Sequence, residues 1–185
     1  MRVFIGIEIP EFIRAKLTRV NEILKRDGLV SGNFVGKNEL HLTLKFLGDE
    51  IDGADLIKIK GILSNVKWKP FNCKIKDYGF FPDENNIKIL WAGVESKELI
   101  LFTKEIEKLL SKEGFRPDES KKELQVHLTL ARISNVRDKI KFKEKLNELK
   151  FGKLDFDVNE ICLFKSELTR AGPIYKKIDS FDLKI

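Results

Sequence analysis

The chain has 185 residues, of which 42% are hydrophobic and 35% are charged, and its formal net charge is +6. This apolar fraction excludes a disordered chain, and the length allows either one domain or two small lobes that share an interface. The modest positive charge is compatible with an anionic partner such as nucleic acid, and equally with a solvated lysine-rich surface. Lys and Glu dominate the charged residues while Met, Cys and His are scarce, which is typical of thermophilic proteins.

Neither cysteine lies in a metal-binding pattern. Cys73 and Cys162 are far apart, with no CxxC and no Cys/His cluster, so we expect two reduced, buried thiols and no metal or other cofactor. Residues 2–9 are too short and too charged for a signal peptide, and no apolar run is long enough to span a membrane. These features predict a soluble, cytoplasmic protein. The sequence leaves the oligomeric state open, and a monomer is the simplest expectation.

The first half of the chain predicts strands that alternate with helices. Pro10 suits the first turn of a helix, and Asp52 suits an N-cap. The predicted elements are a strand at 2–9, a helix from Pro10 to Gly28, an extended piece at 33–35, a strand at 40–47 that ends at Gly48, and a helix after Asp52. The apolar positions expected to bury the two helices are Phe12, Ile13, Leu17, Val20, Ile23, Leu24, Leu56, Ile59, Ile62, Leu63 and Val66.

The second half loosely repeats this order. Its predicted elements are strands at 71–80 and 87–94, a helix from Ser96 to Gly114, a polar loop at 116–123, a strand at 124–133, a lysine-rich helix at 138–149, a strand at 154–164, a turn at 169–173, and strands at 174–178 and 181–185. The apolar sides of its helices are expected at Leu101, Ile106, Leu109, Leu110, Ile140, Phe142, Leu146 and Leu149. The repeated order predicts an α+β fold of two similar lobes within one domain, residues 1–185.

One tetrapeptide, His-Leu-Thr-Leu, occurs twice, at 41–44 and at 127–130, and the two copies hold the only histidines of the chain. Successive side chains of a strand point to opposite faces, so His41 and Thr43 share one face while the leucines pack on the other. His127 and Thr129 follow the same pattern. Each copy therefore presents an imidazole beside a hydroxyl.

Two such strands meeting in a cleft would provide chemistry suited to attack at phosphorus. A neutral imidazole can accept a proton from the attacking oxygen, while a protonated one donates a proton to the leaving oxygen. The threonine hydroxyls can donate hydrogen bonds to phosphate oxygens, where charge develops in the transition state. The competing interpretation is two ordinary half-buried strands, but it leaves the repetition around both histidines unexplained. The sequence is symmetric and does not assign the acid and the base.

The combined motifs resemble the 2H phosphoesterase superfamily, in particular its RNA 2′,3′-cyclic phosphodiesterases, also called 2′-5′ RNA ligases. The resemblance covers nearly the whole chain. The segments that carry it are RVFIGI at 2–7, LHLTLKFLG at 40–48, FFP at 80–82, LWAGV at 90–94, GFRP at 114–117, HLTLAR at 127–132, SEL at 166–168, Gly172 and Tyr175. The chain departs from the family at Phe34, where Trp is common, and at Val126, where Pro is common.

The resemblance implies two pseudo-symmetric lobes around a central cleft, each with an antiparallel sheet and flanking helices. It also implies that His41 is the proton donor to the departing 3′ oxygen and that His127 is the proton acceptor that activates water. Arg132 is implied as a phosphate contact. Strict alternation, however, places Arg132 on the leucine face, so a bulge, a twist or a curled side chain is needed.

Other substrate contacts are open to two interpretations. Lys45 shares the His41 face in an alternating strand, although strand lysines are usually only solvated. Phe46 could stack on a base, as could Phe81 and Phe115, but each also suits a core position. Tyr175 is a further candidate for binding substrate. The lysines of the helix at 138–149 could follow an RNA backbone or form a solvated face.

Three functions fit these residues. The first is metal-independent hydrolysis of a terminal RNA 2′,3′-cyclic phosphate to a 2′-phosphate. The second is the reverse type of reaction, 2′-5′ ligation of RNA ends such as tRNA halves, which would use the same residues. The third is a non-catalytic RNA or nucleotide-binding module that retains the fold. Both histidines and both threonines are present, which favours an enzyme over the third possibility.

Overall fold

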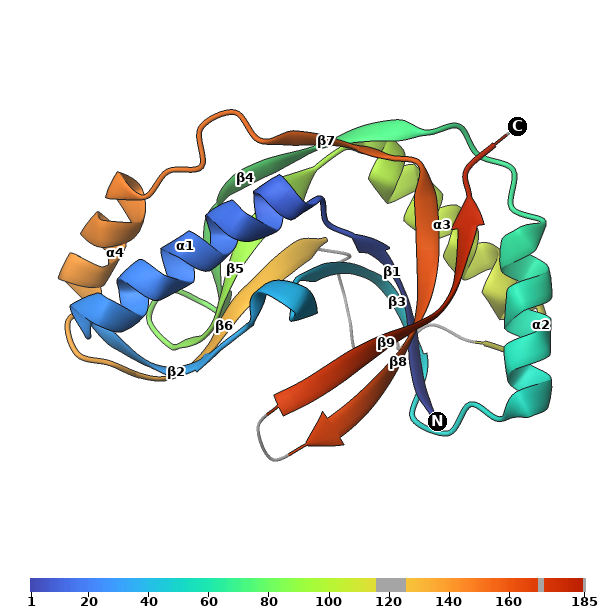
Figure 1. Ribbon diagram of the computed structural model, residues 1–185, viewed down its shortest axis with the longest axis horizontal. Coiled ribbons are helices and arrows are strands. Elements are labelled where there is room, and N and C mark those ends of the chain that lie inside the picture. Colours follow the sequence, from blue (N-terminus) through green and yellow to red (C-terminus); the bar gives the residue numbers. More distant parts are fainter. Residues whose placement is uncertain (116–125, 170–171, 185) are drawn as a thin grey trace.

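The computed structural model describes residues 1–115, 126–169 and 172–184. The described residues form two antiparallel sheets, four α-helices and one short 3-10 helix (Figure 1), in agreement with the predicted α+β class. The elements are β1 (Arg2–Glu8), α1 (Glu11–Asp27), β2 (Val30–Phe34), η1 (Lys37–Glu39), β3 (His41–Gly48), α2 (Gly53–Ser64), β4 (Phe71–Pro82), β5 (Ile87–Glu95), α3 (Lys97–Lys112), β6 (His127–Val136), α4 (Lys139–Glu148), β7 (Asp155–Val158), β8 (Glu160–Thr169) and β9 (Gly172–Asp182).

The two motif strands lie in different sheets, and each sheet contains strands from both halves of the chain. The four-stranded sheet has the order β3-β1-β8-β9, and the five-stranded sheet has the order β2-β6-β5-β4-β7. The first tetrapeptide lies on β3 at an edge, and the second lies on β6 next to the edge strand β2. β3 and β6 also contact each other, so the two tetrapeptides meet between the sheets.

Local sequence signals account for the helix ends. Gly28 ends α1 in the left-handed conformation, at φ 63°, which glycine adopts without the steric cost of a Cβ. The carboxylate of Asp52 accepts the backbone N–H of Asp55 at 2.8 Å, and Ser96 caps α3 in the same way through Leu99. These helix starts are confirmed as predicted.

Three apolar residues expected in the core are exposed instead. Phe12 and Leu101 are 57% exposed and Ile140 is 72% exposed. The buried stripe of α3 runs through Leu99 and Phe102, and Leu101 lies off that stripe because consecutive helical residues differ by about 100°. In α4 the same spacing buries Phe142 and turns Ile140 toward solvent.

The C-terminal strands differ from the prediction. The expected strand at 154–164 is broken at Asn159 into β7 and β8, which belong to different sheets. The backbone carbonyl of Asn159 accepts the N–H of Leu183 at 2.7 Å, which ties the crossing to the end of the chain. The two strands expected at 174–178 and 181–185 form one strand, β9, because it pairs with β8 along its whole length. The predicted loop at 116–123 and residues 124, 125, 170, 171 and 185 lie outside the described residues.

Two helices connect the sheets, because each follows a strand of one sheet and contacts strands of the other. α1 follows β1 of the four-stranded sheet but packs against β2 and β6 of the five-stranded sheet, and α3 follows β5 but contacts β3. Figure 1 shows α1 and α4 on one side of the molecule and α2 and α3 on the other. The main hydrophobic core contains residues of both sheets, including Ile5, Leu42, Leu90 and Leu128. None of the described helices combines the length and apolar character needed to span a membrane.

Candidate active site

A cavity of about 500 Å³ lies where the two tetrapeptides meet. His41 and Thr43 enter it from β3, and His127 and Thr129 enter it from β6. Arg132 and Tyr175 also line the cavity, so six of the eight residues proposed from the sequence come together. Lys45 and Phe46 do not line the cavity that the described residues form.

A β-bulge follows the threonine in each tetrapeptide. In the pairing of β1 with β3, Gly6 lies opposite Thr43 and Ile5 opposite Lys45, which leaves Leu44 as the extra residue. In the pairing of β5 with β6, Trp91 lies opposite Thr129 and Leu90 opposite Ala131, which leaves Leu130 as the extra residue. Each bulge reverses the alternation of the residues that directly follow it.

The second bulge explains how Arg132 reaches the cavity. Leu130 and Ala131 are both buried, and the next residue, Arg132, returns to the face of His127 and Thr129. The conflict between strict alternation and the implied phosphate contact of Arg132 is thereby removed. The bulge therefore places Arg132 on the cavity side of β6.

The first bulge has the opposite effect on Lys45. The prediction that Lys45 shares the face of His41 is wrong, because the bulge turns this residue into the protein, where its side chain is 5% exposed. The Lys45 ammonium lies 3.5 Å from the carboxylate of Glu107 on α3. Lys45 therefore connects β3 to α3. Phe46 returns to the His41 face opposite Phe4, but it packs beside the cavity.

His41 is held in one orientation by backbone and aromatic contacts. Its Nδ1 lies 2.7 Å from the carbonyl oxygen of Glu39, and since a carbonyl can only accept, Nδ1 carries a proton and donates it. Nε2 is then the nitrogen that can exchange a proton with a ligand. The imidazole also contacts the rings of Phe4 and Tyr175, with centroid distances of 4.7 and 4.4 Å. Burial lowers the pKa of His41, and the hydrogen bond to Glu39 partly offsets this effect.

His127 also lies against aromatic rings. The centroid of its imidazole lies 4.9 Å from that of the Phe81 ring, in a T-shaped contact, and 5.9 Å from that of the Trp91 ring. Gly79 allows Trp91 to occupy this place, because a Cβ at Gly79 would come within 2.1 Å of the indole. From the sequence, Phe81 was expected in the core or stacked on a base, and Trp91 had no expected role at the site. The pairing of β4, β5 and β6 brings the rings of Phe81 and Trp91 next to His127, and this pairing is not evident from the sequence.

The cavity wall includes residues that were not predicted. Asn33 and Phe34 contribute from β2, Glu39 contributes from η1, and Pro173 and Ile174 contribute from the β8–β9 hairpin. The only sequence signal among them was Phe34, which occupies a position where the resembled family commonly has Trp. The Lys25 ammonium lies 5.2 Å from the centre of the Phe34 ring. This contact places a positive charge beside Phe34.

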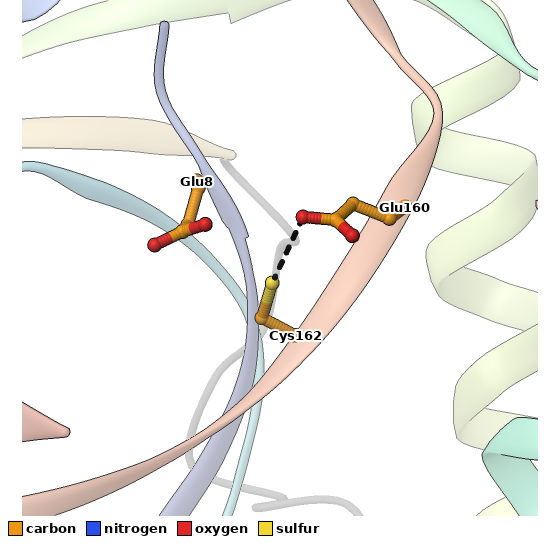
Figure 2. Close-up of side chains that lie close together, drawn as sticks. All are labelled: Glu8, Glu160 and Cys162. Atoms are coloured by element: carbon orange, nitrogen blue, oxygen red, sulfur yellow. Dashed lines mark hydrogen bonds between the residues drawn. The ribbon is translucent and has the colours of Figure 1, made fainter. Parts of the chain in front are cut away.

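Beside His41, the structure brings together three side chains that could in principle hold a metal ion. Glu8, Glu160 and Cys162 have ligand atoms within 4.8 Å of one another (Figure 2). Burial raises the pKa of the Cys162 thiol to about 12, with further contributions from Glu160 and Glu8, so the sulfur is protonated. It contacts Glu160 Oε1 at 3.8 Å, while Glu8 forms an ion pair with Lys177 at 2.7 Å. Glu8, Glu160, Cys162 and Lys177 therefore form a cluster held by a hydrogen bond and an ion pair.

Comparison with known proteins agrees with this geometry. The family described as the AKAP7 2′5′ RNA ligase-like domain matches residues 4–183. The chain is 36% identical to the RNA 2′,3′-cyclic phosphodiesterase of Methanocaldococcus jannaschii, over 96% of this chain and 98% of that protein. It is 33% identical to the protein of the same name from Methanothermobacter thermautotrophicus, over 99% of both chains.

Solved structures give the same result for the fold. A crystal structure of a Thermus thermophilus protein aligns with 100% of this chain and 98% of its own chain, with a TM-score of 0.76 and 25% sequence identity. The apo structure of E. coli LigT has a TM-score of 0.77 at 20% identity, with coverage of 100% and 98%. With a family match over almost the full length, the chain belongs to the 2H phosphoesterase family, among the AKAP7 2′5′ RNA ligase-like domains.

Proposed function

We propose that the chain hydrolyses 2′,3′-cyclic phosphate at RNA ends and leaves a terminal 2′-phosphate. The observation that carries this proposal is the convergence of two imidazoles, two threonine hydroxyls and one guanidinium on a single cavity. The curated relatives named RNA 2′,3′-cyclic phosphodiesterase support the choice of substrate.

In this reaction His127 accepts a proton from a water molecule, whose oxygen attacks the phosphorus. The bond between phosphorus and the 3′ oxygen breaks, and His41 donates a proton from Nε2 to that oxygen. The product carries a 3′-hydroxyl and a 2′-phosphate. The hydrogen bond from Nδ1 to Glu39 supports this role for His41, because it fixes the ring with Nε2 free to donate.

The remaining site residues stabilise the charge that develops on the phosphate. The hydroxyls of Thr43 and Thr129 donate to the two non-bridging oxygens, and the guanidinium of Arg132 neutralises part of their charge. The ring of Tyr175 packs at 69° to the imidazole of His41, with centroids 4.4 Å apart, and limits rotation of the imidazole away from the substrate. No step in this scheme requires a metal ion.

The test is turnover of an oligoribonucleotide with a 2′,3′-cyclic phosphate end, in the presence of EDTA. His41→Gln and His127→Gln should each lower kcat by roughly 10²- to 10⁴-fold, the usual contribution of general acid–base catalysis. Thr43→Val and Thr129→Val should lower kcat less, and Thr18→Val on α1, which does not line the cavity, is the matched control. End-group analysis should find only 2′-phosphate.

Two results would contradict the proposal. One is activity that disappears on chelation, and the other is activity that survives both histidine substitutions unchanged. RNA binding without any change of end group would instead support a non-catalytic module.

A second candidate is 2′-5′ ligation, which the description of the matching family favours. A 5′-hydroxyl would replace water as the nucleophile. Cleavage of the same bond between phosphorus and the 3′ oxygen would leave a 3′-hydroxyl and a 2′-5′ phosphodiester. Incubation with tRNA half-molecules separates the two reactions, because joined products and hydrolysed ends differ in length. Both should depend on His41 and His127.

A further inference from the structure

The sheet face that carries His41 extends beyond the cavity in two directions. Along β1, alternation places Arg2, Phe4 and Glu8 on this face, while Val3 and Ile5 point into the main core. Glu8 lies directly opposite His41 in the pairing of β1 with β3. Arg2 lies six residues earlier on the same strand. The two ends of this face therefore carry opposite charges.

The Glu8 end is unfavourable for a polyanion. Glu8 and Glu160 lie close together beside Cys162 (Figure 2), with Lys177 paired to Glu8. A phosphodiester that left the cavity in this direction would meet two carboxylates and one ammonium group. Like charges at such short range repel.

The Arg2 end is connected to the cavity by aromatic contacts. Phe4 lies 4.7 Å from His41 and 5.3 Å from Tyr175, and Phe46 packs against the same small cluster. The Arg2 guanidinium lies 4.6 Å from the centre of the Phe46 ring. Burial raises the pKa of Tyr175, whereas the charges of Arg132 and Arg2 lower it, so both guanidinium groups lie near enough to act on the Tyr175 hydroxyl.

Arg2 is both fixed and accessible. Its side chain is 40% exposed, and one nitrogen donates to Asp49 at 2.8 Å. A guanidinium has five N–H donors, so the pair with Asp49 leaves donors for a further anion. The stacking on Phe46 and the pair with Asp49 hold the group in place before any ligand arrives.

We infer that the RNA strand upstream of the reacting end leaves the cavity over Tyr175 and Phe46, and that Arg2 binds an upstream phosphodiester. This inference rests on the proposed function, because it extends the same substrate by one or more nucleotides. A nucleoside 2′,3′-cyclic phosphate has no upstream phosphodiester. Arg2 therefore distinguishes RNA ends from free cyclic nucleotides.

The experiment compares a nucleoside 2′,3′-cyclic phosphate with di- and trinucleotides that end in the same group. The quantity measured is the ratio of kcat/KM for the oligonucleotide to kcat/KM for the mononucleotide. Arg2→Gln should lower this ratio several-fold. Asp49→Asn should raise it, because it removes a carboxylate that competes for Arg2 and repels phosphate. Both substitutions break the same ion pair, so a merely structural role predicts shifts of the same sign.

A matched pair on α1 serves as the control. Arg19 and Glu22 also form an exposed ion pair, at 3.8 Å, and Arg19→Gln and Glu22→Gln change the net charge by the same amounts. Neither should alter the ratio. Arg2→Gln should also reduce the salt dependence of oligonucleotide binding, by about 0.7 in the slope of log K against log salt for one phosphate contact.

The outcomes separate this inference from the proposed function. If the wild-type protein hydrolyses the mononucleotide and Arg2→Gln leaves the ratio unchanged, the inference is wrong and the proposed function stands. A fall of the ratio in both Arg2→Gln and Asp49→Asn would also overturn it. If the wild-type protein hydrolyses none of the substrates, the proposed function fails first.

Discussion

At the scale of single residues, His41 combines two properties that oppose each other in the free protein. A proton donor has to be protonated before the reaction, yet burial disfavours the imidazolium and lowers the pKa of His41 from its ordinary value of 6.5. A bound cyclic phosphate brings a negative charge close to the ring and stabilises the imidazolium. In the proposed reaction, the substrate would thus help to protonate His41, the proposed proton donor.

We therefore predict a ligand-dependent titration of His41. In the free protein, NMR of the ring C–H signals should give a pKa below 6.5 for His41, and inorganic phosphate should raise it. Only two histidines are present, and His127→Gln leaves one signal to assign. A pKa at or above 6.5 without ligand would contradict this prediction.

The same shift has a consequence for stability. Because the pKa of His41 is lowered in the folded state, the unfolded chain binds more protons than the folded chain at pH values between the lowered pKa and 6.5. The contribution of His41 to stability is complete above pH 6.5 and is lost as the pH falls below it. His41→Gln should remove this part of the pH dependence.

At the scale of elements, the bulge of β6 depends on a buried side chain of α1. Asn21 is 2% exposed, and its amide nitrogen donates to the carbonyls of Val35 and Leu130, at 3.0 and 3.1 Å. Leu130 is the extra residue of the bulge, and its carbonyl also accepts the N–H of Val35 at 2.8 Å. Asn21 therefore helps to fix the backbone that turns Arg132 toward the cavity.

Substitutions at Asn21 should show this dependence. Asn21→Leu removes the donor to the part-buried carbonyl of Val35 and to the buried carbonyl of Leu130, and should cost about 1–3 kcal/mol in the free energy of unfolding by urea. Asn21→Asp should cost more, because a carboxylate would face two carbonyl oxygens. The KM for a cyclic phosphate should rise in both, since Arg132 is less well positioned. Asn147→Leu, at an exposed position of α4, should stay within about 0.5 kcal/mol of wild type. Equal stability of Asn21→Leu and wild type would refute the dependence.

The two bulges mark the limit of what the sequence predicts at this scale. Alternation within each tetrapeptide placed His41 and Thr43 on one face, because that relation depends on neighbouring residues only. Lys45 was placed wrongly because the bulge arises from the pairing of β3 with β1. The paired residues Ile5 and Lys45 are 40 residues apart in the sequence, so neighbouring residues alone do not predict the bulge. The break at Asn159 has the same cause, since it depends on which sheet each segment joins.

At the scale of the whole molecule, each half of the chain supplies one imidazole and one hydroxyl, and neither half encloses the cavity alone. α1 follows β1 of the four-stranded sheet but packs on β2 and β6 of the other sheet, and α3 contacts β3. The main core includes residues from both sheets. We therefore propose that the two lobes form one cooperative domain and do not unfold separately.

The two tryptophans can test this proposal. Trp68 contacts Phe102 of α3, with centroids 5.4 Å apart, while Trp91 lies in the five-stranded sheet beside His127. Each of the variants Trp68→Phe and Trp91→Phe retains one tryptophan as a fluorescent probe. Because the core is continuous, the midpoint of urea unfolding measured by this fluorescence should equal the midpoint measured by far-UV circular dichroism in the same variant. A ligand that contacts both histidines, such as inorganic phosphate, should shift the two probes together, since it binds only when both halves are folded. Separate midpoints for fluorescence and circular dichroism within one variant would mean that the lobes unfold independently. The cavity would then be formed by two domains that dock.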